Sequence, residues 1–395
     1  MILVMRVKVI VIGGGASGLV AAIHAAMNNE VILLEKNKNC GKKISITGNG
    51  KCNFFNEDFS LKHFNSSDLK LIPSFENAKE KILTLMKQIG VEYYEKNGYY
   101  YPLSNQATTV QNALIKEALV RKVTIVQEVE VTKIKKLNQF EIETNQGNFK
   151  ADKVILATGS KAYPKTGSDG LGYEILKEMG HTIIPIKPAL TSMETNPFYK
   201  ELSGVRTNAV VKLYRNDNLL KEETGEIQFT DYGVSGICVM NTSNLAQPHD
   251  LLKIDLVPTI SDIISYLDLK NQTVKNRTIQ ELLDGLLNYK IVNLILKLSS
   301  LSNQDTWQQI PTEKKQILVN YLKKLSFNVT GLKGFERSQV CKGGLSLQEV
   351  SSNFESKKIS GLYIVGELLD VVGDCGGYNL AFAFMTGMIA GGSIK

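Results

Sequence analysis

The first forty residues alternate between apolar runs and small, flexible residues. An apolar run at 9–12 leads into a glycine-rich turn at 13–18, an alanine-rich segment follows, and a second apolar run at 31–34 ends at Glu35. Short apolar runs bounded by turn residues are typical of buried strands, and the segment between them has the composition of a helix. The pattern therefore predicts a β-α-β unit at the start of the chain.

Further along, the hydrophobic spacing predicts two helices and a hairpin. Apolar residues recur at helical spacing over 76–89, and a second helix is expected over 107–121. Tyrosines on both sides of Asn97 and Gly98 predict a hairpin, because this dipeptide favours a tight two-residue turn. Short β-patterns then follow at 123–126, 129–134, 140–143 and 148–151. We interpret these as a small antiparallel element inserted in the first domain.

The second half of the chain changes character more than once. A buried strand at 154–156 and a helix at 172–180 are followed by Pro185 and Pro188, where we expect a domain boundary. A hairpin pattern at 205–223 begins a β-rich region. A long segment with almost no β-pattern follows it, and a last buried strand pattern appears near the C-terminus.

These patterns predict an α/β protein of three domains. A Rossmann-like domain, with a parallel sheet and a small antiparallel insert, is expected over 1–188 and 355–395. A β-rich second domain is expected over 189–260 and 325–354, and a helical insert domain over 261–324. The 395 residues are more than one compact core usually holds, which agrees with this division.

Composition narrows the class of protein without deciding it. Hydrophobic residues make up 43% and charged residues 22% of the chain, which is ordinary for a globular enzyme. The five cysteines are odd in number and widely spaced, so we expect no disulfide framework and no metal site. The net charge of +7 suits anionic cofactors, and the lysines are scattered rather than gathered in runs. We therefore expect a cytoplasmic protein without a nucleic-acid or membrane partner, and the oligomeric state stays open.

The glycine turn carries the strongest chemical signal. Gly13 permits a tight strand-to-helix turn, Gly15 lets the backbone approach a pyrophosphate, and Gly18 lets the helix pack on the strand. The helix N-terminus offers unpaired N–H groups and a partial positive charge to the phosphates. Glu35 stands about 20 residues further on, where an acid binds the adenosine ribose hydroxyls. Together these features predict a dinucleotide-binding site.

Two further glycine-rich segments fit the same ligand. Segment 47–53 is small and polar, and Lys42, Lys43 and Lys51 are candidate partners for a phosphate or a flavin carbonyl. Segment 373–380 opens the last helix, whose N-terminus suits the negative charge that develops on a reduced flavin. Only one dinucleotide fingerprint occurs in the sequence, so we expect a nicotinamide coenzyme to dock directly over the flavin.

The chain resembles the BaiN and aminoacetone-oxidase-like flavoproteins, which are NAD(P)/FAD-dependent oxidoreductases. The resemblance rests on motifs that occur in order over nearly the whole chain. They are VIGGGASG at 11–18, GKK through GNGKCN at 41–53, ATG at 157–159, TGSDG at 166–170, FTDYGVSG at 229–236, KGGLS at 342–346, and GELLD through GDCGGYN at 366–379. Two positions depart from the family: Asn49 replaces a glycine and Lys51 an arginine. Lysine keeps the charge but loses the planar fork of arginine.

The resemblance implies one non-covalent FAD per chain in a Rossmann-like domain, with NADH or NADPH as a possible co-substrate. The motifs and the resemblance together yield a set of expected cofactor-binding residues. These are Gly13, Gly15, Ala16, Ser17, Gly18, Glu35, Lys36, Lys43, Thr47, Gly48, Lys51, Cys52, Asn53, Val129, Ala157, Thr158, Gly159, Gly366, Glu367, Asp370, Gly377, Tyr378, Asn379 and Leu380.

The reaction is less defined than the cofactor. We expect an FAD-dependent oxidoreductase that transfers hydride between flavin N5 and a small organic substrate or NAD(P)H. The resemblance implies either reduction of unsaturated 3-oxo, bile-acid-like compounds or oxygen-dependent oxidation of small amines such as aminoacetone. A tRNA-modifying or RNA-binding flavoprotein and a non-catalytic redox sensor are alternatives. No residue type identifies a catalytic acid or base, and Tyr378 and Asn379 are candidates because they begin the last helix.

Overall fold

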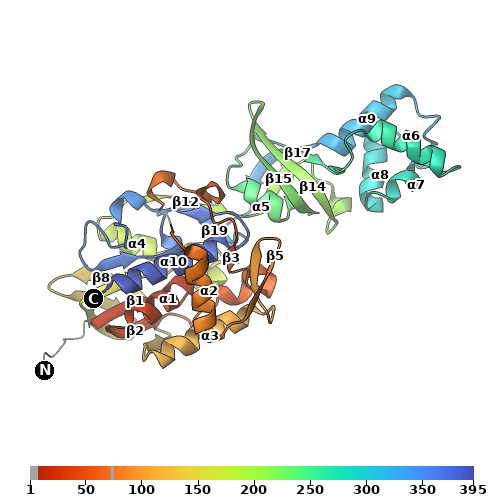
Figure 1. The fold of residues 1–395 in the computed structure, drawn as a ribbon. Coiled ribbons are helices and arrows are strands. Elements are labelled where there is room, and N and C mark those ends of the chain that lie inside the picture. The colour runs from red at the N-terminus through yellow and green to blue at the C-terminus, as the bar shows by residue number, and fades with distance from the viewer. Residues whose placement is uncertain (1–7, 73–74) are drawn as a thin grey trace. The chain divides into compact units, whose positions relative to one another are not determined.

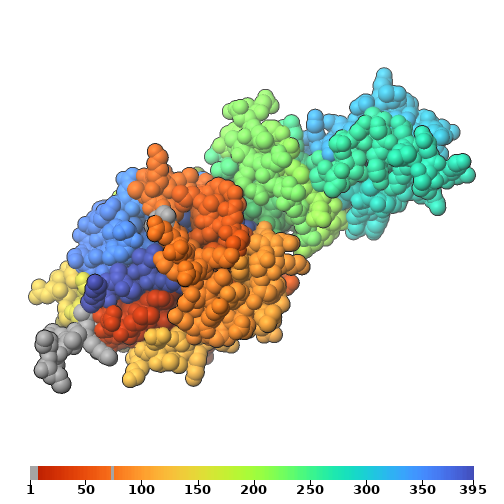
Figure 2. Space-filling model, in the orientation of Figure 1, coloured from red at the N-terminus to blue at the C-terminus, as the bar shows by residue number. Residues whose placement is uncertain are grey.

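The computed structural model describes residues 8–72 and 75–395. The chain divides into two compact units, which we call unit 1 (Met1–Ala189 with Ser338–Lys395) and unit 2 (Leu190–Arg337). In the space-filling view, the orange N-terminal part and the dark blue C-terminal part of the chain lie together in unit 1 (Figure 2). The first boundary falls one residue after the expected end of the first domain at 188, whereas the chain returns to unit 1 at Ser338 instead of at 355.

Unit 1 is built on a five-stranded parallel sheet with the order β20-β11-β1-β2-β7. The strands are β1 (Lys8–Ile12), β2 (Glu30–Glu35), β7 (Thr124–Gln127), β11 (Lys153–Leu156) and β20 (Leu362–Ile364). The central strands are buried on both faces, which explains why their sequences are nearly continuous apolar runs. The predicted Rossmann-like sheet is confirmed.

Strand β7 corrects one prediction. We expected 123–126 to belong to the antiparallel insert, but β7 pairs in parallel with β2, with Ile32 opposite Thr124. Helix α3 (Ala107–Val120) precedes β7 and supplies the long crossover that a parallel pair needs. Short turns join the next strands, which form the antiparallel insert. They are β8 (Val131–Lys136), β9 (Phe140–Thr144) and β10 (Gly147–Ala151).

The tyrosine hairpin forms as predicted. Strands β5 (Tyr93–Lys96) and β6 (Tyr99–Pro102) pair antiparallel, and Asn97 and Gly98 adopt φ values of 54° and 84°. Two smaller pairings extend this region. Strand β3 (Phe55–Asn56) joins β6, and β4 (Phe64–Asn65) pairs with β21 (Val372–Gly373). The second of these pairings ties the chain after the second glycine segment to the chain that precedes the last helix.

Helices α1 (Ala16–Ala25) and α10 (Tyr378–Ser393) pack side by side in unit 1 (Figure 1). A Cβ on Gly387 would stand 2.5 Å from the carbonyl oxygen of Ser17, and one on Gly391 would clash with the carbonyl oxygen of Ala21. Only glycine allows backbones to approach this closely. Because the two contacts advance together along both helices, α1 and α10 run in the same direction.

The remaining elements of unit 1 include one pair of strands that the sequence analysis missed. Strands β12 (Ile183–Ala189) and β19 (Val340–Leu345) pair antiparallel. We expected Pro185 and Pro188 to interrupt the chain, but they lie within β12, which has an irregular register there and is bonded to a single neighbour. This pairing explains why the residues after Ser338 belong to unit 1. The other helices of unit 1 are α2 (Ala78–Gln88), α4 (Leu171–Glu178) and the 3₁₀ segments η1 (Ile44–Gly50), η2 (Leu61–His63), η3 (Leu69–Leu71), η4 (Pro164–Thr166), η6 (Leu347–Glu349) and η7 (Gly366–Leu368).

Unit 2 is a closed β-barrel with helices. In barrel order the strands are β13 (Met193–Asn196), β16 (Gly233–Ser235), β15 (Asn218–Phe229), β14 (Arg206–Arg215), β17 (Leu251–Asp255) and β18 (Leu325–Leu332). The helices are η5 (Lys200–Leu202), α5 (Ile237–Ser243), α6 (Ile263–Thr273), α7 (Ile279–Asp284), α8 (Tyr289–Leu298) and α9 (Thr312–Lys324). One hydrophobic cluster includes barrel residues such as Leu213 and helix residues such as Ile291 and Trp307. The predicted helical region therefore shares its core with the barrel.

The C-terminal helix α10 is apolar along most of its 16 residues. Among the described helices, none combines the length and the apolar composition that crossing a bilayer requires.

Candidate functional site

The first glycine turn connects β1 to α1 and is set by close packing. The N–H of Gly13 donates to the carbonyl of Leu34 at 2.8 Å, which joins the turn to β2. Gly13 has φ +102°, and a Cβ there would stand 2.5 Å from the carbonyl oxygen of Ala157. A Cβ on Gly18 would clash with the carbonyl oxygen of Gly13. These two glycines are therefore required by the fold itself.

Gly15 has a different surrounding. Within the described ranges, no heavy atom lies within 4 Å of the position that a Cβ on Gly15 would take. Gly15 is also the N-cap of α1. Within the described ranges, no side chain accepts a hydrogen bond from the first backbone N–H groups of this helix. The first-turn N–H groups and the positive end of the helix dipole thus face open space. This arrangement fits the pyrophosphate of a dinucleotide such as FAD.

Glu35 ends β2 beside this turn. It is buried, and its Oε2 accepts a hydrogen bond from the N–H of Gly14 at 2.7 Å. Its Oε1 accepts from the backbone and side-chain nitrogens of Asn37 at 2.8 and 2.6 Å. Three bonds hold the carboxylate, and its remaining acceptor capacity suits a ribose hydroxyl. The backbone N–H of Val129 donates to the Glu35 carbonyl at 3.0 Å, so Val129 lies at the same edge of the sheet.

Lys36 lies next to Glu35 but has partners on the protein. Its ammonium lies 2.6 Å from a carboxylate oxygen of Asp169 and 3.7 Å from one of Glu130. Lys36 therefore lies near the expected binding site of the adenosine part of FAD, where its ammonium belongs to an ion-pair network. Its contact with the cofactor stays a prediction.

The second glycine segment is a kinked 3₁₀ segment rather than an open loop. Gly48, Asn49 and Gly50 adopt left-handed φ values of 56°, 55° and 82°. Asparagine tolerates this conformation better than most residues, which explains how Asn49 replaces a glycine. The backbone carbonyl of Thr47 accepts a hydrogen bond from the N–H of Cys52 at 3.0 Å, and the Thr47 hydroxyl donates to the backbone carbonyl of Ile44 at 2.7 Å. The segment is thus held in one shape.

The charged and sulfur-containing residues of this segment differ in exposure. Lys51 is exposed, whereas Cys52 is fully buried, and burial raises the pKa of the Cys52 thiol to about 12. Lys43, just before the segment, forms a 3.0 Å salt bridge with Glu367. The hydroxyl of Ser160 donates to the same Glu367 oxygen at 2.7 Å. This contact joins three expected cofactor regions that lie far apart in the sequence.

Other expected residues lie around the same turn. A Cβ on Gly366, which has φ +68°, would stand 2.5 Å from the hydroxyl of Ser17, so the turn after β20 touches the start of α1. Asp370 is buried and accepts the N–H of Ser67 at 2.8 Å. The hydroxyl of Thr158 is buried and has no hydrogen-bond partner among the described residues. It lies against α4 at Gly172, so Thr158 also contributes to helix packing.

The C-terminal glycine segment forms the N-terminus of α10. Its N-cap is Gly377 at φ +96°, and no side chain in the described ranges caps the helix. The side chain of Asn379 accepts the N–H of Gly373 at 2.8 Å and donates to its carbonyl at 2.9 Å, which clamps the preceding loop. A Cβ on Gly377 would stand 2.8 Å from the nitrogen of Phe55, beside the second glycine segment. Leu380, in the first turn of α10, is half-buried.

The two uncapped helix N-termini are offset along one direction. The helices run parallel, and Gly387 of α10 lies against Ser17 at the start of α1. Ten residues separate Gly377 from Gly387, so α10 begins about 15 Å beyond the α1 N-terminus along the axis. One extended ligand with a phosphate group and a distant electron-accepting ring suits this spacing.

Sequence reasoning missed a group of side chains beside Tyr378. The Tyr378 ring is buried and stacks on His63 at 4.6 Å and on Phe59 at 6.3 Å between ring centroids. His63 in turn contacts Asp374 at 3.3 Å and Asp58 at 3.2 Å. His63 and Asp374 are 311 residues apart in the sequence, so no spacing rule identifies them as partners.

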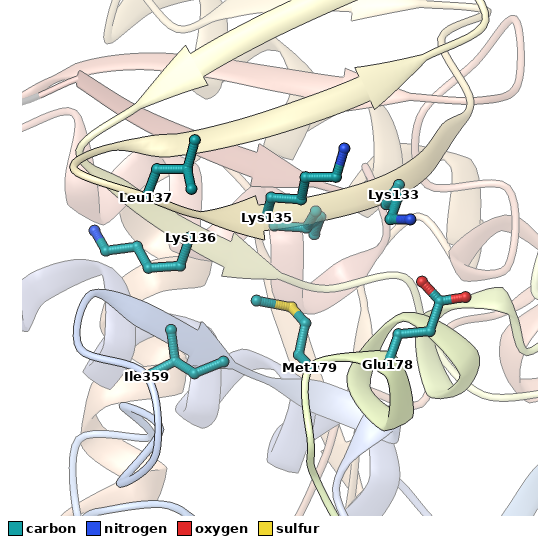
Figure 3. A pocket seen from close by; sticks show the side chains of 8 residues that line it. Lys133, Lys135, Lys136, Leu137, Glu178, Met179 and Ile359 are labelled. Atoms are coloured by element: carbon teal, nitrogen blue, oxygen red, sulfur yellow. The ribbon is translucent and has the colours of Figure 1, made fainter.

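A separate hollow of about 720 Å³ lies on the antiparallel insert. Figure 3 shows Met179 and Ile359 below β8, with lysines of β8 above them. Lys135 pairs with Glu143, and the Lys136 ammonium lies 4.1 Å from the centroid of the Phe140 ring. Neither the glycine turns nor the start of α10 contribute to its lining. The hollow is therefore distinct from the expected cofactor site.

The parallel sheet, the glycine turn at the α1 N-terminus and the acid at the end of β2 define a Rossmann-type, dinucleotide-binding protein. Residues 7–393 match the family model described as "HI0933-like protein Rossmann domain". The chain belongs to this family of flavoproteins, as the resemblance predicted.

Two curated relatives are similar over nearly their whole length. The 3-dehydro-bile acid delta(4,6)-reductase of Clostridium scindens is 37% identical, with 96% of this chain and 97% of the relative covered. The ribosomal RNA dihydrouridine synthase of Haemophilus influenzae is 27% identical, with 95% of each chain covered. Relatives of this family therefore include enzymes named for RNA as well as for a small molecule, and the expectation that this chain has no nucleic-acid partner stays open.

A solved structure agrees with the fold. The 3-ketosteroid-delta4-(5alpha)-dehydrogenase of Rhodococcus jostii aligns with a TM-score of 0.54 at 14% identity, covering 100% of this chain and 98% of that one. At this identity the likeness supports the fold and says nothing of the substrate.

Proposed function

We propose that this chain is an FAD-dependent reductase of carbon–carbon double bonds conjugated to a carbonyl group, with NADH or NADPH as the reductant. The structural observation that carries the FAD-dependent part of this proposal is the offset between the uncapped N-termini of α1 and α10. The first suits the pyrophosphate of FAD. The second suits the pyrimidine edge of the flavin ring, where negative charge accumulates on reduction.

The names of the relatives support this reaction class. A 3-dehydro compound with delta(4,6) unsaturation has double bonds in conjugation with its 3-oxo group. Uridine likewise has a ring double bond next to a carbonyl, and a dihydrouridine synthase is named for saturating it. Both names describe addition of a hydride and a proton across an electron-poor double bond, and we extend that shared chemistry to this chain.

The residues of unit 1 take distinct roles in this proposal. Bound FAD, once reduced, supplies hydride from N5. The α1 N-terminus at Gly15 holds the pyrophosphate, and Glu35 holds the ribose through its remaining acceptor capacity. The clamp formed by Asn379 fixes the loop before α10, so the first N–H groups of that helix are oriented before the charge develops.

For the substrate we propose an apolar 3-oxo compound with conjugated unsaturation, such as a bile-acid-like steroid. The support is the higher identity to the reductase, 37% against 27% for the RNA-modifying relative. A second candidate is uridine in RNA, favoured by the net charge of +7 and by that relative. The two candidates would undergo the same reaction at the flavin. They differ in the molecule that contains the double bond, a small steroid-like compound or an RNA.

The test is to separate the two half-reactions of the purified holoenzyme. Under anaerobic conditions, NADH and NADPH are each mixed with the protein, and the bleaching of the flavin is followed by stopped flow. The reduced protein is then mixed with 3-oxo-4-ene and 3-oxo-4,6-diene steroid acids, with an rRNA transcript, with oxygen and with aminoacetone-type amine controls. We expect fast flavin reoxidation by the steroid acids and a product with a saturated bond.

Other outcomes distinguish the alternatives. Reoxidation by the transcript with formation of dihydrouridine would assign the RNA candidate instead. Reduction of the oxidised flavin by amines, followed by fast reoxidation by oxygen, would assign an amine oxidase. A protein that neither nicotinamide nor amine reduces would contradict the enzyme proposed here.

A further inference from the structure

His63 is held between two carboxylates at the edge of the α10 N-terminus. Its Nδ1 lies 3.3 Å from Oδ2 of Asp374, and its Nε2 lies 3.2 Å from Oδ2 of Asp58. The backbone reinforces the first contact, because the N–H of Asp374 donates to the carbonyl of His63 at 2.8 Å. The next residues along the chain belong to the antiparallel pair β4 and β21, in which Phe64 lies opposite Gly373. The ring is thus fixed relative to the loop that begins α10.

The ring also lies beside the expected flavin position. Its centroid is 4.6 Å from that of Tyr378, the first residue of α10, with 23° between the ring planes. The proposed function assigns this helix start to the pyrimidine edge of the flavin. His63 therefore adjoins the helix start that would face the flavin.

The two carboxylates differ in exposure. The Asp374 side chain is 11% exposed and the Asp58 side chain 47%, while His63 itself is 25% exposed. Hydrogen bonds from Lys62, Ser60 and His63 hold the pKa of Asp58 well below its usual range, so Asp58 stays an anion. The buried carboxylate of Asp374 on Nδ1 fixes the orientation of the imidazole. The other nitrogen, Nε2, contacts Asp58, the more exposed of the two carboxylates.

Other histidines in unit 1 are engaged elsewhere. The side chain of His181 is fully buried and contacts Glu349 at 2.7 Å. Nδ1 of His24 lies 2.9 Å from the carbonyl of Val20 within α1. Of the histidines in unit 1, all of which the structure describes, His63 alone combines partial exposure with a ring contact to Tyr378 at the N-terminus of α10.

We propose that His63 is the proton donor of the reduction and that Asp374 is its positioning residue, an inference that rests on the proposed function. With reduced FAD bound, the β-carbon of the unsaturated ketone would receive the hydride that the cofactor supplies and form a C–H bond, and the π electrons would move to the α-carbon and the carbonyl oxygen. The α-carbon then forms a bond to hydrogen as the Nε2–H bond of His63 breaks. Solvent returns the proton to Nε2, and NADH or NADPH returns the hydride to the flavin.

Two substitutions distinguish the proposed proton donation by His63 from the hydrogen bonds that its ring makes. His63→Asn retains an amide near the Nδ1 position and can still reach Asp374, whereas His63→Gln retains one near Nε2. Both remove the imidazole and its Nε2–H group. With FAD bound and prereduced, we expect both variants to reoxidise with the steroid enone about 10²–10⁴-fold more slowly than the wild type. The pH dependence of that rate should disappear, and flavin reduction by the nicotinamide should slow far less.

Three further variants test the roles of His63 and Asp374. His24→Gln is the matched histidine control and should behave as the wild type. Asp374→Asn should lower the reoxidation rate less than His63→Asn and shift its pH profile. Added imidazole should restore part of the rate of His63→Ala, and in deuterated water the restored product should carry deuterium at the α-carbon. FAD content and thermal unfolding of each variant are measured in parallel.

The outcomes are separable. Wild-type reoxidation rate and pH profile in both His63 variants would overturn the assignment of His63, as would a large loss confined to Tyr378→Phe. Loss of FAD from both His63 variants would assign His63 a structural role and overturn it too. If the wild type itself is reduced by the nicotinamide but is not reoxidised by any enone, the proposed function fails first and the proton donor fails with it.

Discussion

A Cβ on Gly387 would stand 2.5 Å from the carbonyl oxygen of Ser17, so α10 meets α1 backbone to backbone. This contact sets the offset between the two helix N-termini. Ser17 belongs to the first glycine turn, and Gly387 lies ten residues after the start of α10 at Gly377. The spacing between the expected pyrophosphate and flavin positions thus depends on glycines in the interior of a helix, Gly387 and Gly391.

Gly387→Ala should separate the two helices. The added methyl group meets backbone rather than a flexible side chain, so we expect the free energy of unfolding to fall by about 1–3 kcal/mol and FAD affinity to fall with it. Gly392→Ala is the control, because within the described ranges no heavy atom lies within 4 Å of its added Cβ. It should be neutral or stabilise by up to about 1 kcal/mol through helix propensity. Urea unfolding and FAD titration of the two variants test this, and equal behaviour would contradict the packing.

Gly15→Val should separate binding from folding. The added side chain projects into space that the described residues leave open, so the apo-protein should unfold at the wild-type temperature while FAD binding is lost. Gly18→Val should instead destabilise the apo-protein, because its Cβ clashes with the carbonyl oxygen of Gly13. Thermal unfolding of apo-protein and the FAD content of purified protein are the measurements. Normal FAD content in Gly15→Val would refute the pyrophosphate site.

The cysteines near the cofactor should be unreactive. Burial raises the pKa of the Cys40 and Cys52 thiols to about 12, and the Glu35 carboxylate adds to the shift at Cys40. At pH 8 only about one thiol in 10⁴ is then the reactive thiolate. Cys375 is half-buried and should be alkylated first by iodoacetamide. Peptide mass spectrometry after a short exposure tests the order, and early labelling of Cys52 in folded holoenzyme would indicate a reactive thiol instead.

Glu349 should make unit 1 sensitive to acid. Burial by itself raises the pKa of this carboxyl, but hydrogen bonds from Lys358, Thr182 and His181 outweigh burial and lower the pKa from 4.5 to about 2. The stabilisation is therefore complete above the unfolded pKa of about 4.5 and is lost as the pH falls from there toward 2. Thermal unfolding temperatures should fall across this window.

Glu349→Gln provides the comparison for the acid effect. The variant should be less stable than the wild type at pH 7 and should lose less stability between about pH 5 and pH 2, because the titrating group is gone. Glu178→Gln, at an exposed position of α4, should follow the wild-type curve. Parallel wild-type and Glu349→Gln curves would show that Glu349 does not carry the acid sensitivity.

Local patterns in the sequence were sufficient for much of unit 1. The β1-α1-β2 unit, the hairpin at Asn97 and Gly98 and the start of α10 each depend on neighbouring residues, and the structure contains all of them. Partners far apart in sequence were not predictable. Strand β7 belongs to the parallel sheet instead of the insert, and β12 pairs with β19 across about 150 residues. Which strand pairs with which depends on the free strand edges that are available once the chain has folded, and short sequence patterns do not report this.

Motifs along the chain were enough to identify a dinucleotide turn, an acid at the end of the second strand and a family of FAD-dependent oxidoreductases. Backbone conformation at a glycine and the charge of a helix N-terminus are local properties, so motifs report them. The folded chain alone reveals that Gly387 packs on Ser17, that Lys43 pairs with Glu367 and that His63 lies between Asp58 and Asp374. Such contacts arise when the sheet and helices pack, and no spacing along the chain encodes the distance between them.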